Sequence, residues 1–256
     1  MKRSTHYFKT MYRRRNVIKE ALLAFFLGLS SWPRMLLEVP IRRNFGERYF
    51  KFSTAVIITV ILALTPISWI EGTRRFYGGS NGSAFLGSYL TWYAYLAYFF
   101  YCALQRREEI KRLPGVFDFA RFSLSTGLIN RFFYEFEING RRFSVRTIET
   151  VLEPSLFFIA GMVLWFSTQP IGFVLLICSI FYSFSYIAAY TEGDNFLMDK
   201  IDERICNEEL VNAFINDTSP EESRGFNFYG RRPADPDARR QMANLFVADD
   251  EIVEAM

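Results

Sequence analysis

The amino-acid sequence predicts an all-α polytopic membrane protein with about four transmembrane helices. Half of its 256 residues are hydrophobic, and many of them gather in runs long enough to cross a bilayer. Charge is segregated as well, because basic residues dominate the N-terminal part while the C-terminal part is rich in Asp and Glu. Such segregation around apolar runs is typical of membrane topology rather than of nucleic-acid binding.

Residues 1–51 are predicted to form a basic cytoplasmic arm. Within it, residues 17–32 contain an apolar run that Lys19 and Glu20 shorten to about a dozen residues, too few for a full span. We therefore expect an amphipathic helix in the cytoplasmic interface, with Arg and Lys near anionic lipid headgroups. The apolar side chains expected to extend that contact are Trp32, Met35, Leu36 and Leu37. The alternatives are an additional span and a cleaved signal peptide.

Four segments are long and apolar enough to be predicted as spans. They are Phe52–Ile70, Ala84–Leu104, residues 150–167 and Pro170–Tyr190. The first two make up residues 52–104, and the last two make up a tight helical hairpin, residues 150–190. Pro66 lies late in the first segment, where it predicts a kink or an early end of the helix.

Basic residues in the loops predict the orientation. The N-terminal arm and the loop 105–149 carry many Arg residues and are expected in the cytoplasm. The loop 71–83 has two Arg residues, and the turn at Gln169 has no charge. We therefore predict a multi-pass protein of a bacterial inner (plasma) membrane with both termini in the cytoplasm.

A small cytoplasmic β-hairpin, residues 133–146, is predicted inside the loop 105–149. Asn139-Gly140 is a strong signal for a two-residue type I′ turn, and in that register Glu137 faces Arg142. The apolar face of the hairpin, a candidate interaction surface, comprises Tyr134, Phe136, Ile138, Phe143 and Val145. A lone two-stranded hairpin is marginal in water, so this face should rest on the same chain, a second copy or a partner.

Residues 191–256 are predicted to form an acidic cytoplasmic helical tail that is partly disordered. Gly193 is expected to break the helix of the fourth span, with Asp194 capping the next helix. Asp235 and Pro236 are expected to open a last short helix. The apolar tail residues that are candidates for contact with a partner are Ile201, Ile205, Leu245 and Phe246.

Motifs that carry enzymatic chemistry are missing or out of context. The sequence has no Walker loop, dinucleotide fingerprint or zinc-ligand spacing, and its three cysteines lie far apart. Residues 78–82 match G-x-S-x-G, but that motif needs a His, and His6 is predicted across the membrane from Ser80. Glu153, at the inner end of the third span, is predicted to be an interface residue. No catalytic residue, metal ligand or cofactor is therefore predicted.

The spans offer contacts between helices instead. Ala55, Thr59 and Ala63 repeat every four residues, which creates a small-residue face for packing within the bundle or against another protein. The predicted function is a non-enzymatic scaffold or anchor of a multi-protein membrane complex, of the kind that serves secretion, conjugation or the envelope. It would recruit partners through the hairpin and the tail.

The expected partners are membrane lipids and other protein subunits, with a homo-oligomer as an option and no direct contact with nucleic acid. Two other functions stay open. One is an oligomeric channel lined by hydroxyl and aromatic side chains such as Thr59, Tyr93 and Tyr186. The other is a membrane enzyme that acts on lipid through Ser80 or Glu153.

Overall fold

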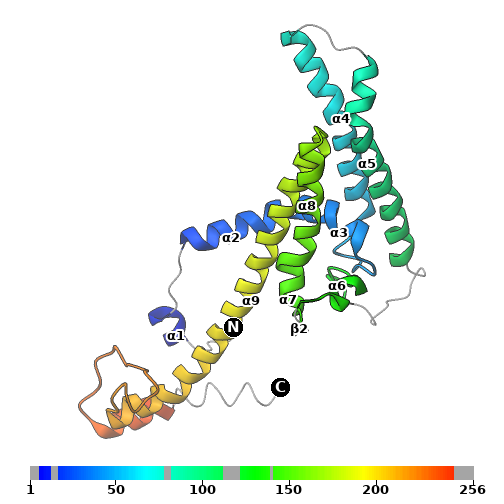
Figure 1. Cartoon of the computed structure of the whole chain (residues 1–256). Helices are drawn as coiled ribbons and strands as arrows, with labels where there is room; N and C mark the ends of the chain where they lie inside the picture. Colours follow the sequence, from blue (N-terminus) through cyan, green and yellow to red (C-terminus); the bar gives the residue numbers. More distant parts are fainter. Residues whose placement is uncertain (1–5, 13–16, 78–81, 112–121, 139–140, 245–256) are drawn as a thin grey trace. The chain divides into compact units, whose positions relative to one another are not determined.

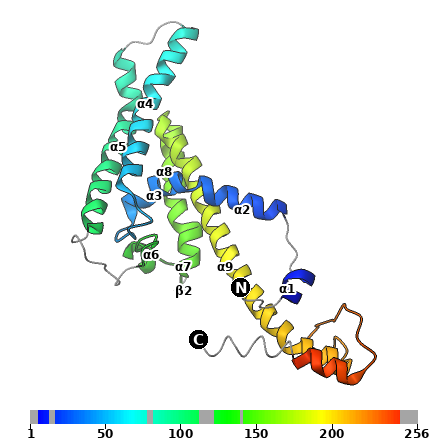
Figure 2. The same ribbon diagram turned by 180° about the vertical axis from the view of Figure 1, so that it is seen from behind.

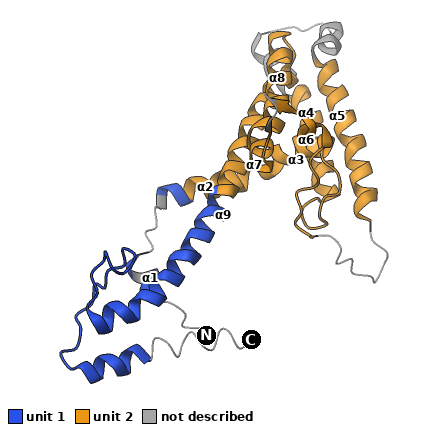
Figure 3. Cartoon of the chain, turned by 60° about the horizontal axis from the view of Figure 1, so that its bottom comes forward, with its two compact units in different colours: residues 1–20, 191–256 blue, residues 21–190 orange. Residues whose placement is uncertain are grey.

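The chain divides into two compact units, shown in different colours in Figure 3. The structure is a computed structural model that describes residues 6–12, 17–77, 82–111, 122–138 and 141–244. Unit 2 is Ala21–Tyr190, and unit 1 combines Met1–Glu20 with Thr191–Met256. Both units are mostly helical, so the predicted all-α class is confirmed.

Figure 1 labels the elements in chain order. The helices are α1 (His6–Met11), α2 (Val17–Leu29), α3 (Ser31–Ile41), α4 (Phe52–Tyr77), α5 (Gly82–Ile110), α6 (Arg131–Glu135), α7 (Val145–Thr147), α8 (Glu153–Phe166) and α9 (Pro170–Asn216). The π-helix η1 (Ile148–Leu152) leads into α8, and β1 (Glu137–Ile138) pairs with β2 (Arg141–Arg142). Residues 236–244 are helical too, as the sequence predicted, and Asp235 Oδ1 accepts a hydrogen bond from the Asp237 amide at 3.1 Å.

Among the described residues, two helices are long and apolar enough to cross a membrane: Val145–Phe166 and Pro170–Asn216. Counting the bent pair Ile18–Leu29 and Ser31–Ile41 as one span gives three. The chain therefore has the composition of a membrane protein, but the predicted count of four spans is not supported. Within α4, the apolar part whose side chains the structure describes is Phe52–Ser68, which is too short to count as a span by itself. In α5, tyrosines and small polar residues lower the apolar content.

Unit 2 exposes large apolar side chains along most of its helices, in the manner of a protein surrounded by lipid. On α4 they include Ile57, Val60, Ile61 and Leu64, and on α8 they include Ile159, Val163 and Phe166. A soluble protein rarely exposes apolar patches of this extent. The exposed surface therefore agrees with the apolar composition of the helices.

The helices α2 and α3 are bent by 49° relative to each other and differ in what they bury. On α2, the apolar stripe Ile18, Leu22, Phe25 and Leu29 is exposed. On α3, by contrast, Met35, Leu36 and Leu37 are buried in the core of the protein. The prediction that these three side chains extend an interfacial contact is therefore wrong, although Trp32 is exposed.

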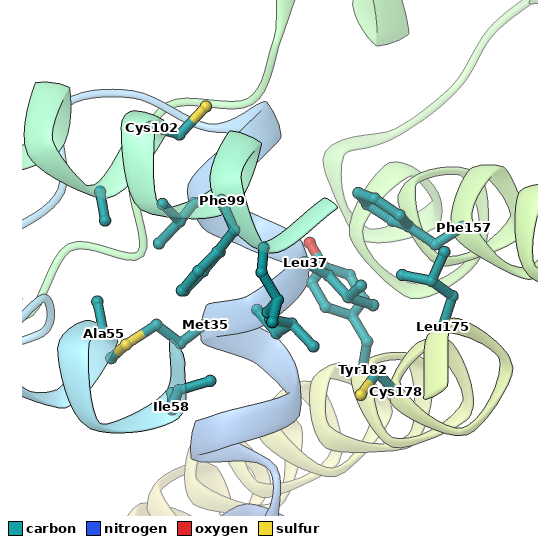
Figure 4. Packing of buried hydrophobic residues seen from close by; sticks show 14 of the residues in the cluster. Met35, Leu37, Ala55, Ile58, Phe99, Cys102, Phe157, Leu175, Cys178 and Tyr182 are labelled. Carbon is teal, nitrogen blue, oxygen red and sulfur yellow. The ribbon is translucent and has the colours of Figure 1, made fainter. Parts of the chain in front are cut away.

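Figure 4 shows the main hydrophobic core, where side chains of α3, α4 and α5 meet those of α8 and α9. The packing of α4 on α5 is fixed by two side chains of α5. The Trp92 indole donates to the Leu62 carbonyl at 2.9 Å, and the Tyr93 hydroxyl donates to the Ala63 carbonyl at 3.2 Å. These hydrogen bonds satisfy the polar groups of two aromatic side chains of α5 inside the protein, which explains how such a polar helix packs among apolar ones.

The helices α8 and α9 form the tight hairpin that the sequence predicted, and they lie side by side in Figures 1 and 2. The turn between them places Thr168 at a φ of 61°. Two glycines allow the helices to approach closely. A Cβ on Gly172 would lie 2.6 Å from the Gly161 carbonyl oxygen, and a Cβ on Gly161 would lie 2.9 Å from the Gly172 carbonyl oxygen.

The loop after α3 is paired with the segment before α6 by backbone hydrogen bonds. The Leu128 amide donates to the Arg43 carbonyl at 2.7 Å, and the Gly46 amide donates to the Ser125 carbonyl at 2.9 Å. Gly46 is required there because a Cβ would lie 2.6 Å from the Ser125 nitrogen. This pairing joins two segments about eighty residues apart in the sequence.

The predicted β-hairpin over residues 133–146 is wrong in that form. Its first strand is replaced by α6, whose start is capped by Asn130, and its second strand ends where Ser144 caps α7. Four residues form a short antiparallel ladder in which Glu137 lies opposite Arg142. The Asn139-Gly140 turn lies outside the described residues. Local capping thus favours helix at both ends of the segment that the sequence pattern assigned to strands.

Unit 1 is built from both ends of the chain. Its core consists of Phe8, Cys206, Leu210, Ala213 and Phe226. Tyr7 and Tyr12 close this core, because the Tyr229 amide donates to the Tyr7 hydroxyl at 2.7 Å and the Asn227 amide donates to the Tyr12 hydroxyl at 3.1 Å. Burial raises the pKa of both phenols, so they remain neutral donors and acceptors at physiological pH.

The helix α9 continues through the predicted break at Gly193 and Asp194 and ends at Asn216. The predicted cap at Asp194 is therefore wrong. Glycine in a helix interior costs about 1 kcal/mol relative to alanine. The helix continues in spite of this cost, because its later turns contribute side chains to the core of unit 1.

We predict that Gly172→Ala destabilises the protein by about 1–3 kcal/mol, because the new methyl group would collide with backbone atoms of α8. Gly193→Ala is the matched control, since nothing lies within 4 Å of its Cβ position. This control should stabilise α9 by about 0.5–1 kcal/mol. Thermal unfolding in detergent measures both effects, and equal shifts for the two variants would contradict the close helix approach.

Candidate functional site

Unit 2 encloses a cluster of charged and phenolic side chains, which we call the buried network. Its members are Arg34, Glu38, Arg42, Tyr49, Glu149, Glu153, Tyr182, Tyr186 and Tyr190. They come from α3 and the loop after it, from η1 and α8, and from α9. Ionisable groups among membrane helices are costly and are candidates for a functional site by default.

Arg42 is the centre of the buried network and is 0% exposed. Its Nε donates to Oε2 of Glu153 at 3.1 Å, and its Nη2 forms a second ion pair with the same carboxylate. Its Nη1 lies 3.1 Å from Oε1 of Glu149 and donates to the Tyr186 hydroxyl at 2.6 Å. A guanidinium with two carboxylate partners satisfies its buried charge through charge-assisted hydrogen bonds.

Glu38 forms the second half of the network, one turn before Arg42 on α3. It accepts hydrogen bonds from Arg34 Nε at 3.0 Å, from the Tyr186 hydroxyl at 2.9 Å and from the Tyr49 hydroxyl. The Arg34 guanidinium also lies 4.0 Å from the centre of the Tyr186 ring, a cation–π contact. Burial, together with the Glu38 carboxylate, raises the pKa of Tyr49, so this phenol remains a hydrogen-bond donor.

The wide π-helical turn of η1 places Glu149 and Glu153 on the same side, where both reach Arg42. Such turns are frequent at functional sites. Two tyrosines of α9 also donate hydrogen bonds to these carboxylates. The Tyr182 hydroxyl donates to Glu153 at 2.5 Å, and the Tyr190 hydroxyl donates to Glu149 at 2.5 Å. Every carboxylate of the network is therefore bonded to at least one guanidinium and one phenol.

This arrangement holds helices of unit 2 together through buried charges. Glu38 and Glu153, its two most deeply buried carboxylates, are 0% exposed. Each ionised group has at least one partner inside the cluster, as a buried charge requires, although Nη2 of Arg34 is buried without a hydrogen-bond partner. Among the described residues, no group of three or more His, Cys, Asp or Glu side chains is placed to hold a metal ion.

The structure corrects two predictions at this site. Glu153 is a buried member of the network and not an interface residue. Arg34 and Arg42 lie within the predicted basic arm, where arginines are expected near lipid headgroups, but both are buried and paired with carboxylates. A charge count along the sequence cannot distinguish an arginine that faces lipid from one that pairs inside the protein.

The predicted interaction residues lie at scattered positions. In the segment of the predicted hairpin, Tyr134, Phe136 and Val145 are exposed, Phe143 stacks on Phe136 at 6.2 Å, and Ile138 pairs with Arg141. In α4, Ala55 is buried in the core, Thr59 Oγ1 donates to the Ala55 carbonyl and Ala63 packs against the core. In the tail, Ile201 is exposed and Ile205 is half-buried, while Leu245 and Phe246 lie outside the described residues.

The spacing of residues in the sequence carries a signal for the network. Its residues recur every four positions: Arg34, Glu38 and Arg42, then Glu149 and Glu153, then Tyr182, Tyr186 and Tyr190. Residues four apart lie on one face of a helix. Three polar stripes in otherwise apolar segments therefore indicate faces that must meet one another.

Comparisons with known proteins do not assign this chain to a family. A scan against protein-family models, a search of curated proteins and a search of solved structures found no match to this chain. The functional argument therefore depends on the arrangement of its residues.

We predict that Arg42→Met destabilises the protein by about 3–5 kcal/mol, because it leaves Glu149 and Glu153 buried without their guanidinium. Thermal aggregation in detergent measures the effect. Arg142→Met is the control, since the ion pair of Arg142 with Glu137 is exposed and should contribute little. Similar melting temperatures for the two variants would show that the network does not hold unit 2 together.

Proposed function

We propose that the chain is a non-enzymatic membrane anchor and scaffold that fixes itself through its apolar helices and recruits protein partners outside the bilayer. The observation that carries this proposal is an exposed apolar patch on α9, beyond Tyr190. Its residues and exposed fractions are Phe196 (65%), Leu197 (59%), Met198 (56%) and Ile201 (44%). Charged residues such as Asp194 and Lys200 interrupt this patch, which distinguishes it from the continuous apolar surface of α8.

We place the protein in a bacterial inner membrane with both termini in the cytoplasm, in a complex of the secretion, conjugation or envelope type. The distribution of Arg among the loops supports this orientation. The composition of unit 1 supports it independently, because Phe8 packs in one core with Leu210 and Phe226. Two ends that share a core lie on the same side of the membrane, so the number of crossings is even.

The buried network supports an anchor more than a channel. Two hydroxyls that were candidates for lining a channel are bonded inside the protein, since Thr59 donates to Ala55 and Tyr186 donates to Glu38. A lipid-modifying enzyme has little support as well. Glu153 is sealed in the network, and Ser80 lies outside the described residues.

We predict that a photo-crosslinking residue at Leu197 captures a discrete protein partner in native membranes, because an exposed apolar patch on a polar helix marks a contact surface. The same crosslinker at the exposed Asn195 is the matched control, since Asn195 points away from Leu197 on the helix. Mass spectrometry of the adducts identifies the partner, and Ile201→Asp should abolish the adduct at Leu197. Adducts with lipid alone, or the same proteins from both positions, would contradict a scaffold role.

We predict that cytoplasmic reporters fused to either terminus are both active, because the shared core of unit 1 requires the termini in one compartment. A reporter that follows Gln169 in a truncated chain should be inactive, since the turn between α8 and α9 lies across the membrane. Activity of one reporter alone would place the two termini in different compartments. This result would contradict both the proposed topology and the shared core of unit 1.

A further inference from the structure

Residues 122–136, which we call the α6 segment, expose a series of large apolar side chains although they belong to a predicted cytoplasmic loop. The segment contains α6 and the irregular chain before it, and it lies at the same end of unit 2 as α7 (Figure 1). Its exposed apolar side chains are those of Phe122, Leu124, Leu128, Phe132, Tyr134 and Phe136. A surface of this kind indicates contact with something other than water.

The level of α6 relative to the bilayer follows from its contact with η1. The candidate span Val145–Phe166 has 22 residues and is about 33 Å long, close to the hydrocarbon thickness of about 30 Å. Its first residue therefore lies near the edge of the hydrocarbon layer, and η1 begins three residues later. Because α6 contacts η1 and buries Phe133, α6 lies at this edge as well.

A hydrogen bond to the buried network gives a second, independent indication of this level. Arg42 Nη1 donates to Thr126 Oγ1 at 3.2 Å and to the Thr126 carbonyl at 3.4 Å. The same guanidinium is paired with Glu153, which follows Val145 by eight residues, or about 12 Å along a helix. The irregular part of the α6 segment is therefore held beside the first turns of the span.

The backbone of the α6 segment has the hydrogen bonds that such a position requires. Irregular chain near hydrocarbon needs its amides and carbonyls to be bonded within the protein. Arg43 and Leu128 exchange backbone hydrogen bonds at 2.7 and 3.5 Å, and the Arg48 amide donates to the Ser123 carbonyl at 2.8 Å. At the start of α6, the Asn130 side chain accepts from the Phe132 amide at 3.1 Å.

Aromatic rings connect the exposed face of α6 with the start of the span. The ring of Phe136 lies 6.4 Å from that of Phe132 and 6.2 Å from that of Phe143. Phe143 precedes Val145 by two residues, and Val145 is exposed as well. Aromatic side chains at the end of a span are typical of the boundary between the headgroups and the acyl chains.

We propose that the α6 segment is an interfacial element whose exposed apolar side chains insert into the bilayer, in the leaflet where α8 begins. The inference goes beyond the scaffold function, because it assigns a lipid-contact surface to a segment predicted to lie in a cytoplasmic loop. It rests on Val145–Phe166 as a span. Lipid is favoured over a soluble partner because two contacts, α6 with η1 and Arg42 with Thr126, hold the segment beside the span.

The test places a photoreactive phenylalanine at Phe132 of the full chain in vesicles of phosphatidylcholine and phosphatidylglycerol. The same residue at Tyr229 of unit 1 is the matched control, since the exposed fractions of Phe132 and Tyr229 are 62% and 63%. The scaffold function places unit 1 outside the bilayer. Mass spectrometry should therefore find lipid adducts at position 132 and their loss at position 229.

A charge in the segment provides a second test. Phe132→Asp should remove most lipid adducts of a photoreactive residue at Phe136, because an ionised carboxylate is unfavourable near hydrocarbon. Met242→Asp is the control, since Met242 is an exposed apolar residue of unit 1, and it should leave those adducts unchanged. Both residues are exposed, and thermal unfolding verifies that the variants retain the fold.

Three results would overturn the proposal. One is a residue at position 132 that reacts only with water, which would place the segment beyond the headgroups. Another is equal lipid labelling at positions 132 and 229. The third is adducts with protein at position 132, which would make the surface a contact with a partner or a second copy.

A failure of the proposal can be distinguished from a failure of membrane anchoring. The photoreactive residue at Ile159, an α8 side chain with an exposed fraction of 61%, shows whether the span itself is in the bilayer. Lipid adducts at Ile159 without adducts at Phe132 would overturn only the interfacial element. The scaffold function is tested separately through the patch at Leu197.

Discussion

The ion pair between Arg42 and Glu153 is the constraint on which the rest of unit 2 depends. Both side chains are 0% exposed, and a buried charge is tolerated only when its partners are in place. The pair joins the end of α3 to the start of α8, and Tyr182 brings α9 to the same point. Displacing any one of these elements would leave a charge unpaired, so their positions are mutually fixed.

This constraint links packing to the proposed function. A network of buried ion pairs and phenol hydrogen bonds makes the helices that carry it rigid. Rigid helices suit a protein that presents binding surfaces to partners, and two surfaces of this chain are candidates. One is the patch around Leu197, which lies on α9 beyond its apolar segment. The other is the α6 segment, which Arg42 holds through its hydrogen bond to Thr126.

Local patterns predicted much of the fold and little of the site. The α8–α9 hairpin follows from apolar length and a short polar turn, and the helix after Asp235 follows from its cap and proline. The network could not be assigned in this way, because Arg42 and Tyr186 are 144 residues apart in the sequence. Apolar length also predicts spans at α4 and α5 that the described residues do not support, and the predicted strands are shortened to β1 and β2 because Asn130 caps a helix at the start of the segment.

The bend between α2 and α3 shows why charge and apolar content have to be considered together. The stripe of α2 that contains Leu22 and Phe25 is exposed, as suits an interfacial helix, whereas α3 carries Arg34 and Glu38 and buries both. Counted as one segment, the α2–α3 pair is long and apolar enough to be a third candidate span beside Val145–Phe166 and Pro170–Asn216. The charges that α3 carries inside the protein are compensated there, because Arg34 and Glu38 form an ion pair at 3.0 Å.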